Sequence, residues 1–156
     1  SQNSPFTPMV NAWVKGRGEL VPRVDMPDCK KAIRQLYAYV LSNRSPPYSV
    51  KGGVFDVMSS TDGRMYRISR REAIEAERLF ESCEGIDIVP AAAVATASLI
   101  KAVEEKTVPE KDCILLNITG GGEKRLAEER TIHELKPELR ISGIERPEKV
   151  AKDLGL

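Results

Sequence analysis

Apolar residues recur every three or four positions in two stretches near the start of the chain, a spacing that predicts amphipathic helices. The first helix is expected over residues 6–15, ended by Gly16, and the second over residues 29–41, with Asp25 and Pro27 as its start signal. The apolar positions behind these two predictions are Phe6, Met9, Val10, Trp13 and Val14, followed by Ile33, Leu36, Tyr37, Val40 and Leu41.

The chain then changes character, because prolines, serines and glycines interrupt any helical pattern. Residues 43–53 hold two consecutive prolines and two glycines and predict a loop. The stretches 54–58 and 64–68 flank Asp62-Gly63, which is a turn signal. We therefore expect a hairpin, or a loose pair of short strands, in this region.

Two longer helices are predicted in the middle of the chain. Ser69 and Glu72 have the spacing of a capping box, and the helix that they start should end at Gly85. Pro90 suits the first turn of the next helix, which is rich in alanine. Because alanine side chains permit close packing against a neighbour, we expect this second helix to be buried.

The last third of the chain alternates a strand with helices. Residues 113–118 form a short apolar run, typical of a strand covered on both faces of a parallel sheet, and end in the glycine turn 119–122. A polar helix is expected over 123–130, another strand over 139–142 and a final helix over 147–154. This order predicts an α/β fold with a Rossmann-like parallel sheet flanked by helices.

Composition excludes several classes of function. With 24 Lys and Arg against 23 Asp and Glu, the net charge of +1 leaves no basic stripe for nucleic acid. The apolar run 89–100 is well short of the roughly 20 residues that a bilayer span needs. Cys29, Cys83 and Cys113 form no CxxC pair and His133 is the one histidine, so we expect no zinc site and three buried, reduced thiols.

The start of the chain carries two further signals. It lacks the basic and apolar regions of a signal peptide, which predicts a cytoplasmic protein. It also begins at Ser1 without an initiator methionine, so residues 1–156 are expected to be one compact unit truncated from a longer protein. A truncated chain exposes the face that normally packs on the missing portion, which predicts self-association.

The glycine turn is the first candidate for chemistry. Asn117 and Thr119 lie where a buried strand would deliver the chain to the carboxyl edge of a sheet, the place where open α/β folds hold ligands. The hydroxyl of Thr119 suits a ring nitrogen, and glycines such as Gly120 let a ligand approach the backbone. The alternative is that the glycines make only a tight turn, because neither a P-loop nor a GxGxxG motif is present.

A second segment makes the pattern specific. The sequence from Glu84 to Ala93 runs acid-Gly-Ile and then Pro-Ala into the alanine-rich helix, a few tens of residues before the glycine turn. This combination resembles the tryptophan synthase β and threonine synthase superfamily, whose members are fold type II pyridoxal-phosphate enzymes. The resemblance implies that Thr119 contacts the pyridine nitrogen of pyridoxal 5'-phosphate and that Glu84 lies beside the ring, with Gly120 and Asn117 nearby. The alternative for Glu84 is an exposed residue at a helix end.

Residues 1–6, 8–13, 45–49 and 52–54 carry a finer resemblance, which is to the cysteate synthase family of methanogens. It implies conversion of O-phosphoserine and sulfite to L-cysteate and phosphate, in coenzyme M biosynthesis, by a homodimer. Val89 stands where many threonine synthases have Glu, which weakens the alternative of a threonine synthase acting on O-phosphohomoserine. A non-catalytic anion-binding or interaction module is the third alternative.

The resemblance also implies parts that this chain lacks. In the superfamily a Schiff-base lysine and a glycine-rich phosphate loop precede the matched residues, and no lysine here has that context. We therefore expect residues 1–156 to be the C-terminal portion of a two-domain enzyme, with no catalytic residue and no activity alone. Asn3, Arg44 and Ser49 are predicted to reach an anionic substrate, and His133 to lie at the surface or cap a helix.

Overall fold

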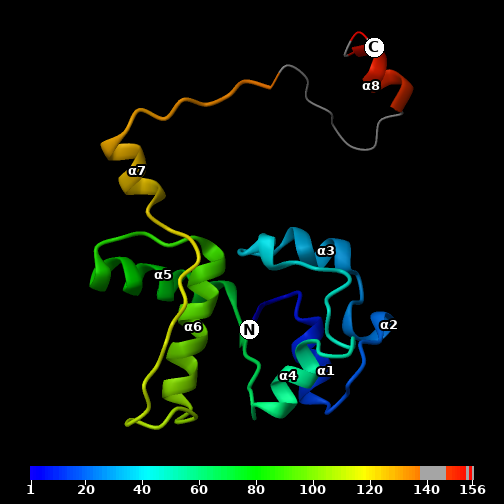
Figure 1. Ribbon diagram of the computed structural model, residues 1–156, viewed down its shortest axis with the longest axis vertical. Helices are drawn as coiled ribbons and strands as arrows, with labels where there is room; N and C mark the ends of the chain where they lie inside the picture. Colours follow the sequence, from blue (N-terminus) through cyan, green and yellow to red (C-terminus); the bar gives the residue numbers. More distant parts are fainter. Residues whose placement is uncertain (138–146, 154, 156) are drawn as a thin grey trace. The chain divides into compact units, whose positions relative to one another are not determined.

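The computed structural model describes residues 1–137, 147–153 and 155, and it divides into two compact units, 1–126 and 127–156, where the sequence led us to expect one (Figure 1). Its assignment to the C-terminal portion of a two-domain enzyme stays a prediction. The elements are β1 (Gln2–Asn3), α1 (Pro8–Val14), α2 (Pro22–Asp25), α3 (Cys29–Arg34), η1 (Tyr39–Leu41), α4 (Val54–Ser60), β2 (Arg67–Ile68), α5 (Arg70–Glu84), α6 (Pro90–Glu104), α7 (Glu123–Glu129) and α8 (Pro147–Asp153).

A small parallel sheet joins the start of the chain to its middle. In this sheet β1 pairs with β2, so that Gln2 lies opposite Arg67 and Asn3 lies opposite Ile68. The side chain of Ile68 is fully buried. The fold is therefore a helix-rich α/β arrangement, which confirms the predicted class, whereas the sheet is smaller than a Rossmann-like one.

The helix predicted over residues 29–41 is shorter than expected, and this prediction is wrong beyond Arg34. The chain leaves the helix because the amides of Tyr37 and Ala38 donate to Asn3 Oδ1, at 3.1 and 3.2 Å, instead of to helical carbonyls. The Asn3 Nδ2 group donates in turn to the Ile68 carbonyl at 2.9 Å. A contact with a residue far away in sequence thus overrides the local apolar periodicity.

The hairpin prediction is also wrong, because residues 54–60 form α4 and residues 67–68 pair with β1. Asp56 in the first turn of α4 accepts a hydrogen bond from Gly52 N at 2.7 Å. Phe55 packs against Trp13 and Tyr48, with ring centroids 5.7 Å apart in both pairs. The aromatic packing and the N-terminal hydrogen bond favour a helix here in spite of β-favouring side chains.

The core lies where α5 and α6 pack against each other. The capping box is confirmed, since Glu72 N donates to Ser69 Oγ at 3.2 Å and Ser69 N donates to Glu72 Oε2 at 2.7 Å. Gly85 ends α5 with a φ of 69°, as predicted. The buried side chains at this interface are small, which permits the close approach of the two helices. They are Ala73, Ala76, Val94 and Ala97, together with Ala38 and Ile68.

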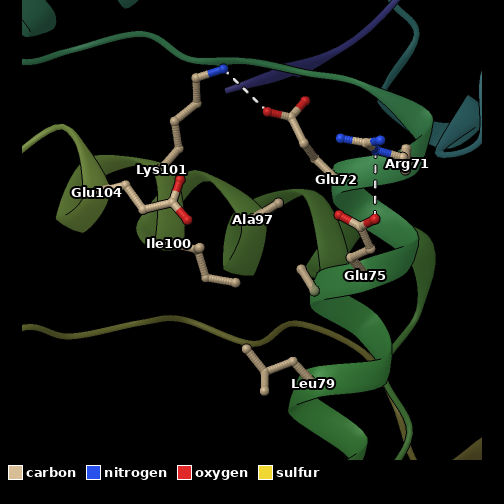
Figure 2. Close-up of a pocket in the computed structure, with 9 residues that line it drawn as sticks. Arg71, Glu72, Glu75, Leu79, Ala97, Ile100, Lys101 and Glu104 are labelled. Atoms are coloured by element: carbon tan, nitrogen blue, oxygen red, sulfur yellow. Dashed lines mark hydrogen bonds and ion pairs between the residues drawn. The ribbon is translucent and has the colours of Figure 1, made fainter.

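An open groove of about 360 Å³ runs along the outer side of the α5 and α6 interface (Figure 2). Lys101 reaches across it to Glu72, with 3.2 Å between Nζ and Oε1, and Arg71 pairs with Glu75 at 3.5 Å. Leu79 is half exposed and also lines this groove. The Lys101–Glu72 pair joins α6 to α5, and the two ion pairs together neutralise much of the charged rim, so the groove offers little free chemistry.

The strand predicted over residues 113–118 is wrong for the part of the chain that the structure describes. These residues have no strand partner there, and Ile114 and Leu115 are 48% and 93% exposed. A strand needs a neighbour to satisfy its backbone groups, and no described segment supplies one. Cys83 and Cys113 are exposed and Cys29 is half-buried, so the predicted burial of the thiols is wrong.

The remaining helix predictions are confirmed at α1, α5, α6, α7 and α8. The strand expected over 139–142 lies outside the described residues. Among the described helices, none is both long enough and apolar enough to cross a membrane.

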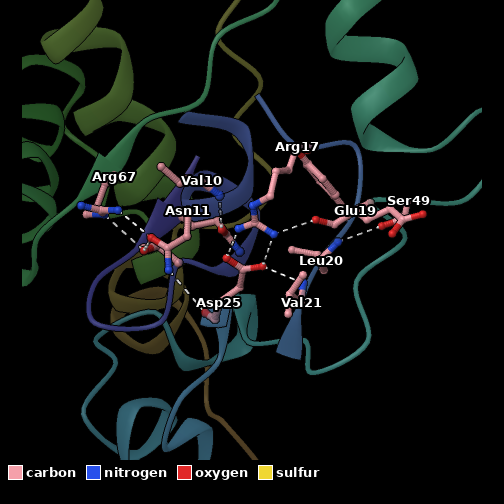
Figure 3. Close-up of polar contacts among 12 residues, drawn as sticks. Val10, Asn11, Arg17, Glu19, Leu20, Val21, Asp25, Ser49 and Arg67 are labelled. Carbon is pink, nitrogen blue, oxygen red and sulfur yellow. Dashed lines mark hydrogen bonds and ion pairs between the residues drawn. The ribbon is translucent and has the colours of Figure 1, made fainter. Parts of the chain in front are cut away.

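A partly buried ion pair joins Arg17, which follows α1, to Asp25 at the end of α2 (Figure 3). Arg17 donates to both carboxylate oxygens of Asp25, with 2.9 Å between Nη1 and Oδ2. Val21 N donates to the same Oδ2 atom at 2.7 Å. The hydrogen bond from Arg17 is the main reason that the pKa of Asp25 lies below its ordinary value of 3.8. This carboxylate therefore stabilises the fold only while it is charged.

Substituting Asp25→Asn should lower the free energy of unfolding by about 1–3 kcal/mol at pH 7, because Arg17 loses its charged acceptor. A lowered pKa in the folded state gives stability that is complete above 3.8 and is lost as the pH falls through the folded-state value. The difference between variant and parent should therefore shrink below pH 3.8. Urea unfolding of variant and parent, at pH 7 and again below pH 3.8, measures this difference in stability. Asp28→Asn, an exposed carboxylate without a cap hydrogen bond, is the control and should change little.

Candidate functional site

The connector between α5 and α6 lies against the glycine turn. Ile88 and Gly121 form an antiparallel bridge. Val89 N donates to the Gly120 carbonyl at 3.1 Å, and Gly122 N donates to the Asp87 carbonyl at 2.8 Å. The structure thus brings together the two segments that the sequence singled out, although 30 or more residues separate them in the chain.

The glycines are required by the chain itself. A β-carbon on Gly121 would lie 2.3 Å from the Asp87 carbonyl oxygen, and one on Gly120 would lie 2.9 Å from Val89 Cγ2. Gly122 has a φ of +78°, which other residues rarely adopt. The tight-turn alternative therefore accounts for all three glycines, and a bound ligand is not needed to explain them.

Asp87 is the residue of this site that sequence reasoning missed. Its side chain is buried and its carboxylate accepts hydrogen bonds from Glu123 N at 3.0 Å and from Lys124 N at 3.3 Å. It therefore caps α7 from a distance of 36 residues. One signal was available: a helix that follows directly on Gly122 has no capping side chain of its own, so another residue has to supply one.

A second contact ties α7 to α5. Lys124 Nζ lies 2.7 and 2.8 Å from the two carboxylate oxygens of Glu81. This hydrogen bond is the main reason that the pKa of Lys124 lies above its ordinary value. Lys124 is exposed and its amine is paired.

Thr119 lies at the open end of the paired segments. Ile118 packs against the cluster of Ile88, Ala92 and Ala93. Because successive side chains of an extended chain point to opposite sides, the Thr119 side chain points away from this cluster. It is exposed, and its hydroxyl has no hydrogen-bond partner among the described residues.

The other residues predicted to bind the cofactor do not all lie next to Thr119. Asn117 and Glu84 are exposed and Gly120 is half-buried. The antiparallel register at Ile88 places Thr119 toward Pro90, whereas Glu84 lies beyond the opposite end of the pairing. No described contact joins Glu84 to Thr119, so a ring touched by both would have to span the paired segment.

The predicted substrate residues do not form one site. Asn3 is buried, and its amide already serves the backbone contacts described above, so this geometry does not support a substrate role. Ser49 Oγ accepts a hydrogen bond from Leu20 N at 3.2 Å in the exposed loop (Figure 3). Arg44 is exposed and lines a shallow surface depression with Lys30 and Arg34. His133 is exposed beyond α7, as predicted.

This chain is similar to curated proteins named as a synthase, which is an enzyme. Among them are the cysteate synthases of Methanosarcina acetivorans, 54% identical over 147 residues, Methanosarcina mazei, 56% over 145, and Methanocella arvoryzae, 54% over 147. The matches cover 93 to 94% of this chain and 35% of each relative, so the chain spans about a third of their length. No family model matches, and no solved structure matches significantly. The resemblance to cysteate synthases is confirmed for the residues of this chain.

The close approach at the glycine turn predicts the effect of added volume. Gly121→Ala should lower the free energy of unfolding by about 1–3 kcal/mol, because its β-carbon overlaps a backbone oxygen that cannot rotate away. Gly16→Ala is the control: its φ is +65° but the space around it is open, so only the backbone cost of about 1 kcal/mol remains. Urea unfolding measures both. A cost for Gly121→Ala no larger than the control would contradict the observed approach.

Proposed function

We propose that this chain is the C-terminal portion of a pyridoxal-phosphate-dependent cysteate synthase, which converts O-phosphoserine and sulfite into L-cysteate and phosphate. The similarity to cysteate synthases along 94% of the chain is the observation that carries the proposal. The pairing of the 87–89 connector with the glycine turn supports it. Because the chain spans a third of its relatives, the activity belongs to the longer protein in this proposal, a cytoplasmic homodimer.

The fit to pyridoxal phosphate rests on Thr119. Its hydroxyl is exposed and has no partner among the described residues, so it is available to the edge of a ring. When bound, pyridoxal phosphate supplies the electron sink that stabilises negative charge on a substrate carbon. Thr119 would hold its proton on Oγ1 and donate it as a hydrogen bond to the ring nitrogen. A neutral donor leaves that nitrogen without a positive charge, which favours elimination and replacement at the substrate's side chain.

The chain contributes positioning to this reaction, and the lysine that carries the cofactor would come from outside residues 1–156. Lys101 is paired with Glu72, and Lys124 is paired with Glu81. Both amines are therefore held in ion pairs with carboxylates of α5. In the proposal this chain orients the ring, while proton transfer belongs to the remainder of the enzyme.

The anion-binding alternative is opposed by the structure of the helix start. The amides of Glu123 and Lys124 are the groups that an anion at α7 would use, and the Asp87 carboxylate already accepts from both. A second negative charge there would be repelled. The threonine synthase alternative has no comparable support, because the matched relatives carry the cysteate synthase name.

Thr119→Ala in the full-length protein should shift the visible absorbance of the bound cofactor and lower turnover roughly 10- to 100-fold, the cost of one lost hydrogen bond to the ring. Thr119→Ser keeps the hydroxyl and is the matched control, expected to retain most of the activity. If the alanine variant leaves both absorbance and turnover unchanged, the proposed contact between Thr119 and the ring is wrong.

The substrates are tested by phosphate release. O-phosphoserine should release phosphate only when sulfite is present, and L-cysteate should accumulate in equal amount. Release of phosphate from O-phosphohomoserine without sulfite would instead support the threonine synthase alternative.

A further inference from the structure

We propose that Asp87 is a positioning residue, which fixes the glycine turn and thereby aims the Thr119 hydroxyl. This inference rests on the proposed function, because Thr119 acquires its role there. Asp87 itself is expected to touch neither cofactor nor substrate. Its part is to hold the backbone that carries the hydroxyl.

Three successive amides are bound by this one residue. The Asp87 carbonyl accepts from Gly122 N at 2.8 Å, and its carboxylate accepts from Glu123 N at 3.0 Å and from Lys124 N at 3.3 Å. The backbone directly after the turn is thus attached at consecutive positions to the connector between α5 and α6. The bond from Val89 N to the Gly120 carbonyl, 3.1 Å long, holds the other side of the turn.

The burial of Asp87 makes these contacts costly to lose. The side chain is 8% exposed, and a buried carboxylate is stable only when hydrogen bonds compensate for the loss of water. The amides at the start of a helix are suited to this, since they also carry the positive end of the helix dipole. A carboxylate at this position therefore stabilises one placement of the helix start over others.

The glycines explain why the turn needs a clamp from outside, formed by the contacts of Asp87 and Val89 with its backbone. Between Thr119 and the start of α7 there are only glycines, which have the greatest backbone freedom of all residues. Ile118, which packs against Ile88, constrains the residue before Thr119, but the glycines after Thr119 add no constraint of their own. The contacts from Asp87 and Val89 supply that constraint, and the ion pair of Lys124 with Glu81 reinforces it from the surface.

The clamp itself can be tested without cofactor. In the protein that contains this chain, freed of pyridoxal phosphate, hydrogen exchange is followed by mass spectrometry in peptides covering residues 119–126. Asp87→Ala should accelerate exchange of the amides of Glu123 and Lys124 about tenfold, whereas Asp87→Asn, which keeps one acceptor oxygen, should have a smaller effect. Asp112→Asn, an exposed carboxylate, is the control and should leave exchange unchanged. Unchanged exchange in Asp87→Ala would overturn the clamp.

The positioning role is tested by a double-mutant cycle on sulfite-dependent phosphate release. Asp87→Ala should lower turnover about tenfold in the parent and by less than twofold in a Thr119→Ala background, because the hydroxyl that it aims is already gone. Asp87→Asn should restore part of the turnover, and it serves as the test if the alanine variant does not fold. Equal losses in both backgrounds would overturn the role.

Failure of the proposed function gives a different result. In that case Thr119→Ala alone would leave turnover and absorbance unchanged, and the positioning role would fall with the ring contact. The exchange measurement would still show whether Asp87 holds the turn.

Discussion

The close approach of Gly121 to the Asp87 carbonyl is the constraint on which the site depends. No side chain fits between these two backbones, since a β-carbon would lie 2.3 Å from the oxygen. The approach allows the bridge between Ile88 and Gly121, and the bridge brings the Asp87 carboxylate to the start of α7. The small side chains between α5 and α6 matter for the same reason, because they fix the two ends of the connector that carries Asp87.

Thr119 gains its exposure from this packing. Ile118 packs inward against the cluster around Ile88, and Thr119, the next residue, is exposed, with no hydrogen-bond partner for its hydroxyl in the part of the chain that the structure describes. The close approaches within the chain are sufficient to explain the glycines that follow Thr119, and the cofactor contact predicted for Gly120 stays a prediction. The chemistry proposed for the turn therefore rests on Thr119 together with the similarity to cysteate synthases.

Local signals in the sequence were sufficient for much of the fold. The capping box of Ser69 and Glu72, the terminating Gly85 and the proline at the start of α6 each act within a few residues, and the structure confirms them. The failures come from long-range contacts. The helix that begins at Cys29 ends early because the amides of Tyr37 and Ala38 donate to the Asn3 side chain. The run 113–118 lacks a partner strand among the described residues. Asp87 escaped notice because it caps a helix 36 residues away.

The central claim is that the Thr119 hydroxyl meets the ring of the cofactor, and a crystal structure of the full-length protein with pyridoxal phosphate measures this most directly. The account predicts about 2.7–3.2 Å between Thr119 Oγ1 and the pyridine nitrogen, as in an ordinary hydrogen bond. A different side chain bound to that nitrogen, with Thr119 turned away from the ring, would contradict it.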